Sequence, residues 1–389
     1  MGKRSYILAM LPLAMVVTGG GAAIVLTLPT SAAFASPPEI SAQETADTLA
    51  ALKPPKRRRP LIAVIGANAG SETTDYLIPY GVLKRADVGD VIALATQNGP
   101  ITMMPALKII PDATIAAFDA QHPDGADYVI VPALHHDDDP ASIAWIKSQV
   151  SKGATIIGIC SGARVLGNAG LLDGRRATTH WYDLAKLRKR HPTMQYVADR
   201  RYVVDRGVAT TTGVSASIPM SLTLIEAIAG RRRAAEVARD LGIEHWDAQH
   251  DSGAFRMNRD FALAAAGNTF AFWGHEKLGI TIEPGVDEVA LALMADAWSR
   301  TYRSHAVTIS ANDKSVKTRG GISVVPDRVA AKSGTKTVLP IIGKEFPARA
   351  LDSALAGIRA RYGRQTFNFV ALQLEYPVRS GASTATQSE

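Results

Sequence analysis

Thr155-Ile156-Ile157-Gly158-Ile159-Cys160-Ser161-Gly162-Ala163 is the stretch that decides the fold. A short β-branched apolar run leads to Cys160, the only cysteine of 389 residues, and a helical pattern follows. This predicts a strand, a sharp turn and a helix, with the cysteine exposed on the turn. Because the free N–H groups and the positive dipole end of that helix point toward the sulfur, we expect Cys160 to favour the nucleophilic thiolate. The alternative is a small buried residue, the usual role of a lone cysteine.

The composition is that of an ordinary globular protein, with 47% hydrophobic and 20% charged residues. One cysteine excludes an internal disulfide framework and a cysteine-rich zinc site. Much of the net charge of +7 lies in Lys56–Arg59 and Arg231–Arg233, runs that are typical of solvated linkers or helix ends. Since no helix-turn-helix or interleaved aromatic and basic pattern is found, we expect no binding of nucleic acid.

Residues 1–35 have the features of a targeting segment. Two basic residues precede a long apolar run, Ile7–Leu28, and Ala33-Phe34-Ala35 offers a small-x-small cleavage site. The segment is either a cleaved signal peptide, which we favour, or an uncleaved membrane anchor. In both cases the remainder is exported to the periplasm or the exterior, and the chain meets the membrane only through this segment.

After a linker over residues 36–60, strands and helices alternate. This order predicts an α/β fold, a parallel-sheet sandwich with helices on both faces. Ligands of such sheets bind at the carboxyl ends of the strands, where Cys160 lies. In the helix expected over 140–150, Ile143, Ile146 and Val150 should face the core. The other expected elements are strands over 61–65, 91–95, 128–131, 202–205 and 208–211, a helix near 75–83 with Pro79 in its first turn, and helices over 182–190 and 215–229.

Five motifs occur in a fixed order along this region: Asp127–Pro132, Gly158–Ala163, Gly170–Gly174, Ala177–Trp181 and Thr211–Ala216. Together they resemble the PfpI/ThiJ superfamily, with its flavodoxin-like, class I glutamine-amidotransferase-like sandwich. Within it, the chain is most similar to the amidase-like domain of AraC-type transcription regulators. The resemblance covers residues 61–230.

The resemblance implies three catalytic residues. Cys160 is the nucleophile on the turn, His180 stands beside it, and the carboxylate from the helix after the first strand falls on Asp75. A carboxylate near sulfur can hold or deliver a proton, and a histidine can accept the thiol proton. The alternatives are an N-cap role for Asp75 and a polar strand end for His180.

The sequence departs from the family pattern at two places. Ala133-Leu134 follows Pro132, where relatives commonly have two glycines whose N–H groups face the substrate oxygen. Ala133, Leu134 and Ser161 are therefore the residues expected to bind the substrate or its oxyanion. Tyr182 stands where glutamine amidotransferases have a glutamate, which argues against glutamine hydrolysis.

The loop His135–Asp139 has the residue types of a metal site, but adjacent side chains seldom converge on one ion. We expect a solvated loop, with no metal and no cofactor. Residues 231–380 form a C-terminal extension, a smaller α/β unit or a dimerisation element, without a DNA-binding domain. A polar tail follows over 381–389. Helices are expected over 286–302, 350–362 and 365–374, strands over 306–310 and 322–325, and aromatic loops that pack on the first domain over 253–256 and 270–275.

Two main functions fit these residues. The first is an exported cysteine-dependent hydrolase or hydratase that acts on a small electrophilic or carbon–nitrogen substrate. The second is a non-catalytic module that binds or senses a small molecule. A redox sensor is a third and weaker possibility, because the sequence holds no second cysteine as a resolving partner. We expect a homodimer in each case.

Overall fold

The computed structural model describes residues 25, 27–32, 34–332, 334, 337–339 and 345–378. Most of the expected targeting segment, residues 1–24, and the polar tail over 381–389 lie outside the described residues. Within the described part, no helix has both the length and the apolar character needed to cross a bilayer.

A seven-stranded sheet forms the first unit, in the order β11-β12-β8-β7-β1-β3-β6. Neighbouring strands are parallel except for β11 and β12, which pair as an antiparallel hairpin. Side chains of β1 alternate between two cores, with Ile62 and Val64 in one and Ala63 and Ile65 in the other. The predicted doubly covered parallel sheet is confirmed. The strands are β1 (Leu61–Gly66), β3 (Asp90–Ala95), β6 (Ala113–Thr114), β7 (Tyr128–Val131), β8 (Thr155–Gly158), β11 (Tyr202–Asp205) and β12 (Val208–Thr211).

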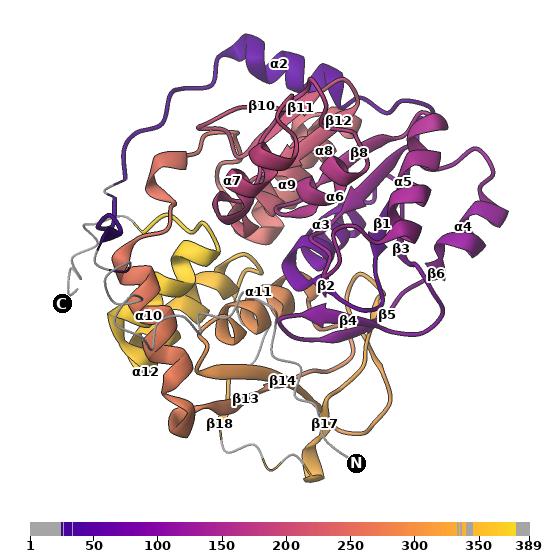
Figure 1. Cartoon of the computed structure of the whole chain (residues 1–389). Coiled ribbons are helices and arrows are strands. Elements are labelled where there is room, and N and C mark those ends of the chain that lie inside the picture. Colours follow the sequence, from indigo (N-terminus) through magenta and orange to yellow (C-terminus); the bar gives the residue numbers. More distant parts are fainter. Residues whose placement is uncertain are drawn as a thin grey trace, which may run out of the picture.

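Helices cover both faces of this sheet (Figure 1). One core contains residues of α3 (Thr73–Ala86) and α8 (Ser217–Ala229). The other contains residues of α4 (Ile115–Gln121), α5 (Pro140–Ser151), α6 (Gly162–Asn168) and α7 (Trp181–Arg190). A short parallel pair, β9 (Arg176–Ala177) and β10 (Gln195–Tyr196), lies outside the main sheet.

Two details of the predicted helices are wrong. Val150 is exposed, because the buried side of α5 runs through residues 142, 145, 146 and 149 and Val150 lies about 40° beyond its edge at Ile146. Pro79 is in the interior of α3 rather than its first turn, because the helix begins at Thr73.

The basic runs behave as expected. The linker holds one short helix, α2 (Ala42–Ala51), and Arg57 in the Lys56–Arg59 run pairs with Asp127 at 2.7 Å. The second run, Arg231–Arg233, forms the first turn of α9 (Arg231–Leu241).

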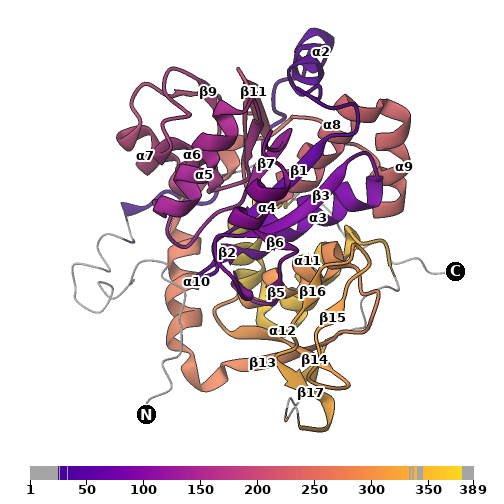
Figure 2. The ribbon, with the colours of Figure 1, turned by 90° about the vertical axis from the view of Figure 1, so that its right-hand side faces the viewer.

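The C-terminal unit is a smaller α/β unit, as predicted (Figure 2). Its parallel sheet has the order β17-β14-β13-β18. The predicted helices over 350–362 and 365–374 appear as one helix, α12, broken at Gly363, where φ is 82°. The elements are α10 (Arg259–Phe270), β13 (Glu276–Thr281), α11 (Glu288–Ser299), β14 (Ser304–Ser310), β17 (Arg328–Val329), β18 (Thr337–Val338) and α12 (Arg349–Gln373).

The aromatic loops do not behave alike. Phe255 is buried, whereas Phe272 and Trp273 are 72% and 79% exposed. The expectation that both loops pack on the first unit is therefore wrong for the loop after α10, whose two aromatic rings contact each other edge to face instead.

The two units share one continuous core, in which α11 packs against α3 (Figures 1 and 2). A Cβ added to Gly81 of α3 would lie 2.6 Å from Glu288 Oε1 of α11, so the helices cross at close range. A five-stranded sheet joins the units further, since β16 pairs with β5. Its strands are β2 (Ser71–Glu72), β4 (Ile101–Met104), β5 (Lys108–Ile110), β15 (Val316–Lys317) and β16 (Ser323–Val324). The domain boundary at residue 230 stays a prediction.

Candidate active site around Cys160

The turn between β8 and α6 places Cys160 at the carboxyl end of the sheet, with φ at 54°. Few residues other than glycine adopt this conformation, which is typical of functional turns. The turn is fixed by hydrogen bonds on both sides: the Cys160 N–H donates to Thr211 Oγ1 at 2.9 Å, and the Thr179 hydroxyl donates to the Cys160 carbonyl at 3.2 Å. Position 162 requires a glycine, because a Cβ there would lie 2.2 Å from the Val131 carbonyl oxygen.

The surroundings of the sulfur do not favour the thiolate. Cys160 is only 8% exposed. Burial raises the pKa of its thiol well above the ordinary value, and the carboxyl groups of Asp75, Glu72 and Glu375 act in the same direction, whereas Arg300 opposes them. The expectation of a thiolate is wrong for this state, because desolvation and negative charge outweigh the helix dipole.

Asp75 lies in the first turn of α3 and is completely buried. The N-cap of α3 is Glu72, whose carboxylate accepts a hydrogen bond from the Asp75 N–H at 2.6 Å, so the N-cap alternative for Asp75 is wrong. Asp75 Oδ2 accepts a hydrogen bond from the Ala133 N–H at 3.1 Å, and Oδ1 has no partner among the described residues. Burial and the charge of Glu72 raise the pKa of Asp75 well above its ordinary value. This raised pKa favours the protonated form of the carboxyl, which can donate a proton.

Arg300 reaches this site from the C-terminal unit. It follows α11, and its Nη2 lies 2.6 Å from Glu72 Oε1 while its Nε lies 2.7 Å from Asp296 Oδ2. Burial raises the pKa of Asp296 to about 8, against the effect of Arg300. None of these three residues was predicted. Glu72 could have been suspected from its place before α3, but Arg300 and Asp296 have no sequence signal because only the tertiary fold brings them there.

His180 is the N-cap of α7. Its Nε2 donates to the Gln373 carbonyl at 2.9 Å, and its Nδ1 accepts from the Tyr182 N–H at 3.3 Å. Both ring nitrogens are therefore engaged away from the sulfur, although the ring stands near the same end of the sheet. Accepting the thiol proton would require His180 to exchange one of these partners.

Glu375, just after α12, connects the C-terminal segment to this part of the site. It is 1% exposed, and its carboxylate accepts hydrogen bonds from the N–H groups of Gly213 and Trp181, each at 2.8 Å. His250 Nε2 lies 3.3 Å from Glu375 Oε2. Burial raises the pKa of Glu375, but the hydrogen bond from His250 and the charges of His180 and His250 outweigh it and lower the pKa to about 2.

The expected oxyanion residues are only partly free. The Ala133 N–H is used by Asp75, and Leu134 pairs with Ser71 in a short antiparallel bridge. The Ser161 hydroxyl donates to Asp183 and lies 3.9 Å from the Cys160 sulfur. The assignment of these three residues to substrate binding stays a prediction.

The His135–Asp139 loop is largely exposed. Asp137 is engaged in ion pairs with Arg164 at 2.5 Å and Arg190 at 3.6 Å. Over the described ranges of the chain, no group of three or more His, Cys, Asp or Glu residues is placed to hold a metal ion.

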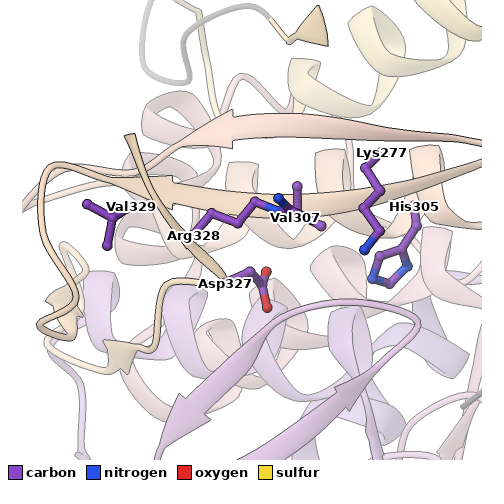
Figure 3. A pocket seen from close by; sticks show the side chains of 6 residues that line it. All are labelled: Lys277, His305, Val307, Asp327, Arg328 and Val329. Carbon is purple, nitrogen blue, oxygen red and sulfur yellow. The ribbon is translucent and has the colours of Figure 1, made fainter. Parts of the chain in front are cut away.

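Three cavities lie in parts of the fold other than the turn that carries Cys160. One, of about 480 Å³, opens on the C-terminal sheet beside Lys277, His305 and Asp327 (Figure 3). Two others, of about 810 and 670 Å³, lie beside α10 and α2. Cys160 lines none of these three cavities.

Comparison with known proteins identifies the family of this chain. The profile of the DJ-1/PfpI family matches residues 61–227. The isonitrile hydratase of Pseudomonas putida is 31% identical over 163 residues, which cover 40% of this chain and 67% of that enzyme. This chain belongs to the DJ-1/PfpI family. The predicted resemblance is thereby confirmed.

Other relatives of this DJ-1/PfpI chain differ in kind. The HTH-type transcriptional regulator CdhR of Pseudomonas aeruginosa is 36% identical over 99 residues, 25% of this chain and 29% of the regulator. The chain thus matches less than a third of that regulator's length. Among solved structures, DJ-1beta of Drosophila melanogaster aligns with a TM-score of 0.43 at 24% identity, covering 48% of this chain and all of that one. The family includes enzyme-like and regulator-like relatives.

Proposed function

We propose that the chain is a cysteine-dependent hydrolase or hydratase that acts on a small substrate with an electrophilic carbon bonded to nitrogen. The observation that carries this proposal is the buried Asp75 carboxyl beside the Cys160 thiol: its Oδ1 has no partner among the described residues, and its surroundings raise its pKa. A protonated acid and a thiol in one desolvated space are the pair needed to add S–H across a carbon–nitrogen multiple bond.

In the proposed reaction, Cys160 Sγ forms a bond to the substrate carbon. At the same time Asp75 protonates the substrate, either at that carbon or at the nitrogen. The thiol proton passes to Asp75, which restores its acid form. Water then attacks the same carbon, the S–C bond breaks, and the sulfur leaves as a thiol. The net change is the addition of one water molecule, with no oxidant or reductant required.

The substrate class follows from the enclosure of the sulfur. Cys160 and Asp75 are buried, and the carboxyls that act on the sulfur are those of Asp75, Glu72 and Glu375, so a negatively charged ligand would be poorly accommodated. A small uncharged isonitrile or nitrile-like compound fits this environment, and the similarity to an isonitrile hydratase supports that class.

The test is turnover of a panel of small aliphatic isonitriles, nitriles and amides by the full chain. We expect hydration of at least one compound, and a loss of turnover of about 10²-fold or more in Cys160→Ser and Asp75→Asn. Asp87→Asn, at an exposed helix C-cap, is the matched control and should keep full activity. Turnover that survives in Cys160→Ser would overturn the proposal.

A second function, binding or sensing of a small molecule without turnover, is favoured by one observation. Both nitrogens of His180 are engaged in other hydrogen bonds, and the raised pKa of the Cys160 thiol disfavours the nucleophilic thiolate. The similarity to CdhR supports the same reading. Saturable binding of a ligand that persists in Cys160→Ser, with no turnover in the wild type, would favour this function over the first.

We also propose that the chain is exported and retained at the membrane by residues 1–35. The segment just after the apolar run is tied to the folded body: the Arg259 N–H donates to the Pro29 carbonyl at 2.9 Å, and Ser31 donates to Asp260 at 2.7 Å. Cleavage after Ala35 would remove these contacts, which supports an anchor rather than the signal peptide favoured from sequence. Mass spectrometry of the full-length product from the membrane fraction should find the N-terminus intact; a chain that begins at Ser36 would refute the anchor.

A further inference from the structure

The C-terminal unit lies outside the region that matches the family profile, yet it supplies Arg300, a guanidinium that opposes the rise in the pKa of the Cys160 thiol. Arg300 is at the C-cap of α11, and its side chain is 12% exposed. The side-chain amide of Gln373, the last residue of α12, donates a hydrogen bond to the Arg300 carbonyl at 3.1 Å. The end of α12 therefore fixes the backbone from which the guanidinium extends.

We infer that Arg300 is a positioning residue of the Cys160 site: it holds the Glu72 carboxylate at the start of α3 and sets the net charge that Cys160 and Asp75 face. The catalytic significance of Arg300 rests on the proposed function, whereas its effect on the ionisation of Cys160 can be measured without any substrate.

The geometry requires an arginine. Nη2 contacts Glu72, the N-cap of α3, and Nε contacts Asp296 of α11, and both distances are below 2.8 Å. A planar guanidinium can satisfy two carboxylates in fixed directions, whereas a lysine ammonium is a point charge on a flexible stem. Glu72 in turn accepts hydrogen bonds from the Asp75 N–H and the Thr74 hydroxyl, so Arg300 anchors the residue that starts α3.

The charges around the sulfur indicate how the ion pair between Arg300 and Glu72 affects Cys160. The titratable groups that face Arg300 and Cys160 are Glu72 and Asp75 of α3, Asp296 of α11, Tyr302 after α11, and Glu375 after α12. One guanidinium faces several carboxyls, so it can neutralise the Glu72 carboxylate while Asp75 keeps its proton. Without Arg300, Glu72 would be a buried charge with no cation beside it, which is costly.

A purely structural role would predict a different result. If Arg300 only joins α3 to α11, its replacement lowers stability and leaves the ionisation of Cys160 unchanged in the folded protein. If it sets the charge of the site, its replacement moves the pH profile of the thiol, because Arg300 opposes the rise in the pKa of Cys160.

The test is the pH dependence of alkylation of Cys160, the sole cysteine, by iodoacetamide in the folded full chain. Arg300→Met should raise the apparent pKa of the thiol by one unit or more, which slows alkylation about tenfold per unit at a pH below the transition. Arg300→Lys should restore at least half of the shift. Arg361→Met, which breaks a similar ion pair with Glu276 far from the sulfur, is the control and should leave the profile unchanged.

A second variant keeps the inference testable if Arg300→Met does not fold. The double variant Glu72→Gln/Arg300→Met removes both charges. Glu72→Gln alone should lower the pKa of the thiol, and the alkylation profile of the double variant should lie between those of Glu72→Gln and the wild type. Unchanged profiles in folded Arg300→Met, or an Arg300→Lys variant identical to Arg300→Met, overturn the inference. A shifted profile in a protein that turns over no compound of the panel would support Arg300 and refute the proposed function separately.

Discussion

At the scale of single residues, the chemistry depends on a proton at Asp75. Replacing it with asparagine removes the acid but keeps the shape and the hydrogen bond to Ala133. Since the Asp75 carboxyl also raises the pKa of Cys160, we expect the thiol of Asp75→Asn to ionise at lower pH and to alkylate faster at neutral pH. An alkylation profile that is unchanged or shifted upward would show that Asp75 does not act on the sulfur.

Glu375 gives a pH-dependent contribution to stability. Its pKa is about 2 in the folded chain against an ordinary 4.5, so folding is favoured when the group is ionised. The contribution is complete above the unfolded value of about 4.5 and is lost as the pH falls through 2, and it amounts to about 3 kcal/mol.

Urea unfolding of the wild type and of Glu375→Gln measures this contribution. The difference in free energy of unfolding should be largest at pH 7 and should fall by about half at pH 3. A difference that stays constant between these pH values would mean that the carboxylate charge is not the stabilising feature.

Sequence reasoning at this scale found the residues that carry a family motif and missed those that only the fold supplies. Cys160, Asp75 and His180 were identified, but the ionisation of Cys160 was wrong because burial and neighbouring carboxyls cannot be read from the motif. Arg300 and Glu375 act through contacts between distant parts of the chain, for which one sequence gives no signal.

At the scale of elements, the turn from β8 to α6 depends on the close approach of Gly162 to β7. Gly162→Ala would place a Cβ 2.2 Å from the Val131 carbonyl oxygen, which cannot be relieved by a side-chain rotation. We expect a loss of about 1–3 kcal/mol in the free energy of unfolding and impaired alkylation of Cys160. Gly267→Ala in α10, where the added Cβ meets open space, is the matched control and should be neutral or stabilising by about 0.5–1 kcal/mol. Equal stability of both variants in thermal unfolding would contradict this account.

Most elements of the first unit were predictable because their apolar patterns are strong and their turns are marked by glycine or proline. The break of α12 at Gly363 was also predicted, as two helices rather than one. Errors arose where a periodic pattern was extended one residue too far, as at Val150, or where aromatic residues were assumed to be buried, as at Phe272 and Trp273.

At the scale of the whole molecule, the first unit depends on the C-terminal one. The side of α3 that carries Tyr80 and Gly81 is buried against α11, and both units share one core. We expect residues 36–230 expressed alone to aggregate, because this apolar side of α3 would be exposed to water. Residues 25–378 are the control and should remain soluble and folded. Size-exclusion chromatography and circular dichroism provide the measurement, and a monomeric, folded 36–230 fragment would show that the boundary at residue 230 separates independent domains.

The class of fold was predictable for the whole chain, whereas the joining of its parts was not. The alternation of strands and helices gave the parallel sheet, and the C-terminal patterns gave a smaller α/β unit. The pairing of β16 with β5 and the crossing of α11 on α3 join segments far apart in the sequence, and neither leaves a local pattern. The homodimer and the small-molecule ligand stay predictions.

The order of residues along the chain determines when each part of the site is synthesised. During synthesis Glu72, Asp75 and Cys160 emerge first, Arg300 emerges much later, and Glu375 comes close to the end. A growing chain therefore contains the Cys160 thiol and the Glu72 and Asp75 carboxyls before Arg300 has been added. A chain that stops before residue 300 would keep the nucleophile but lack the guanidinium that opposes the rise in its pKa.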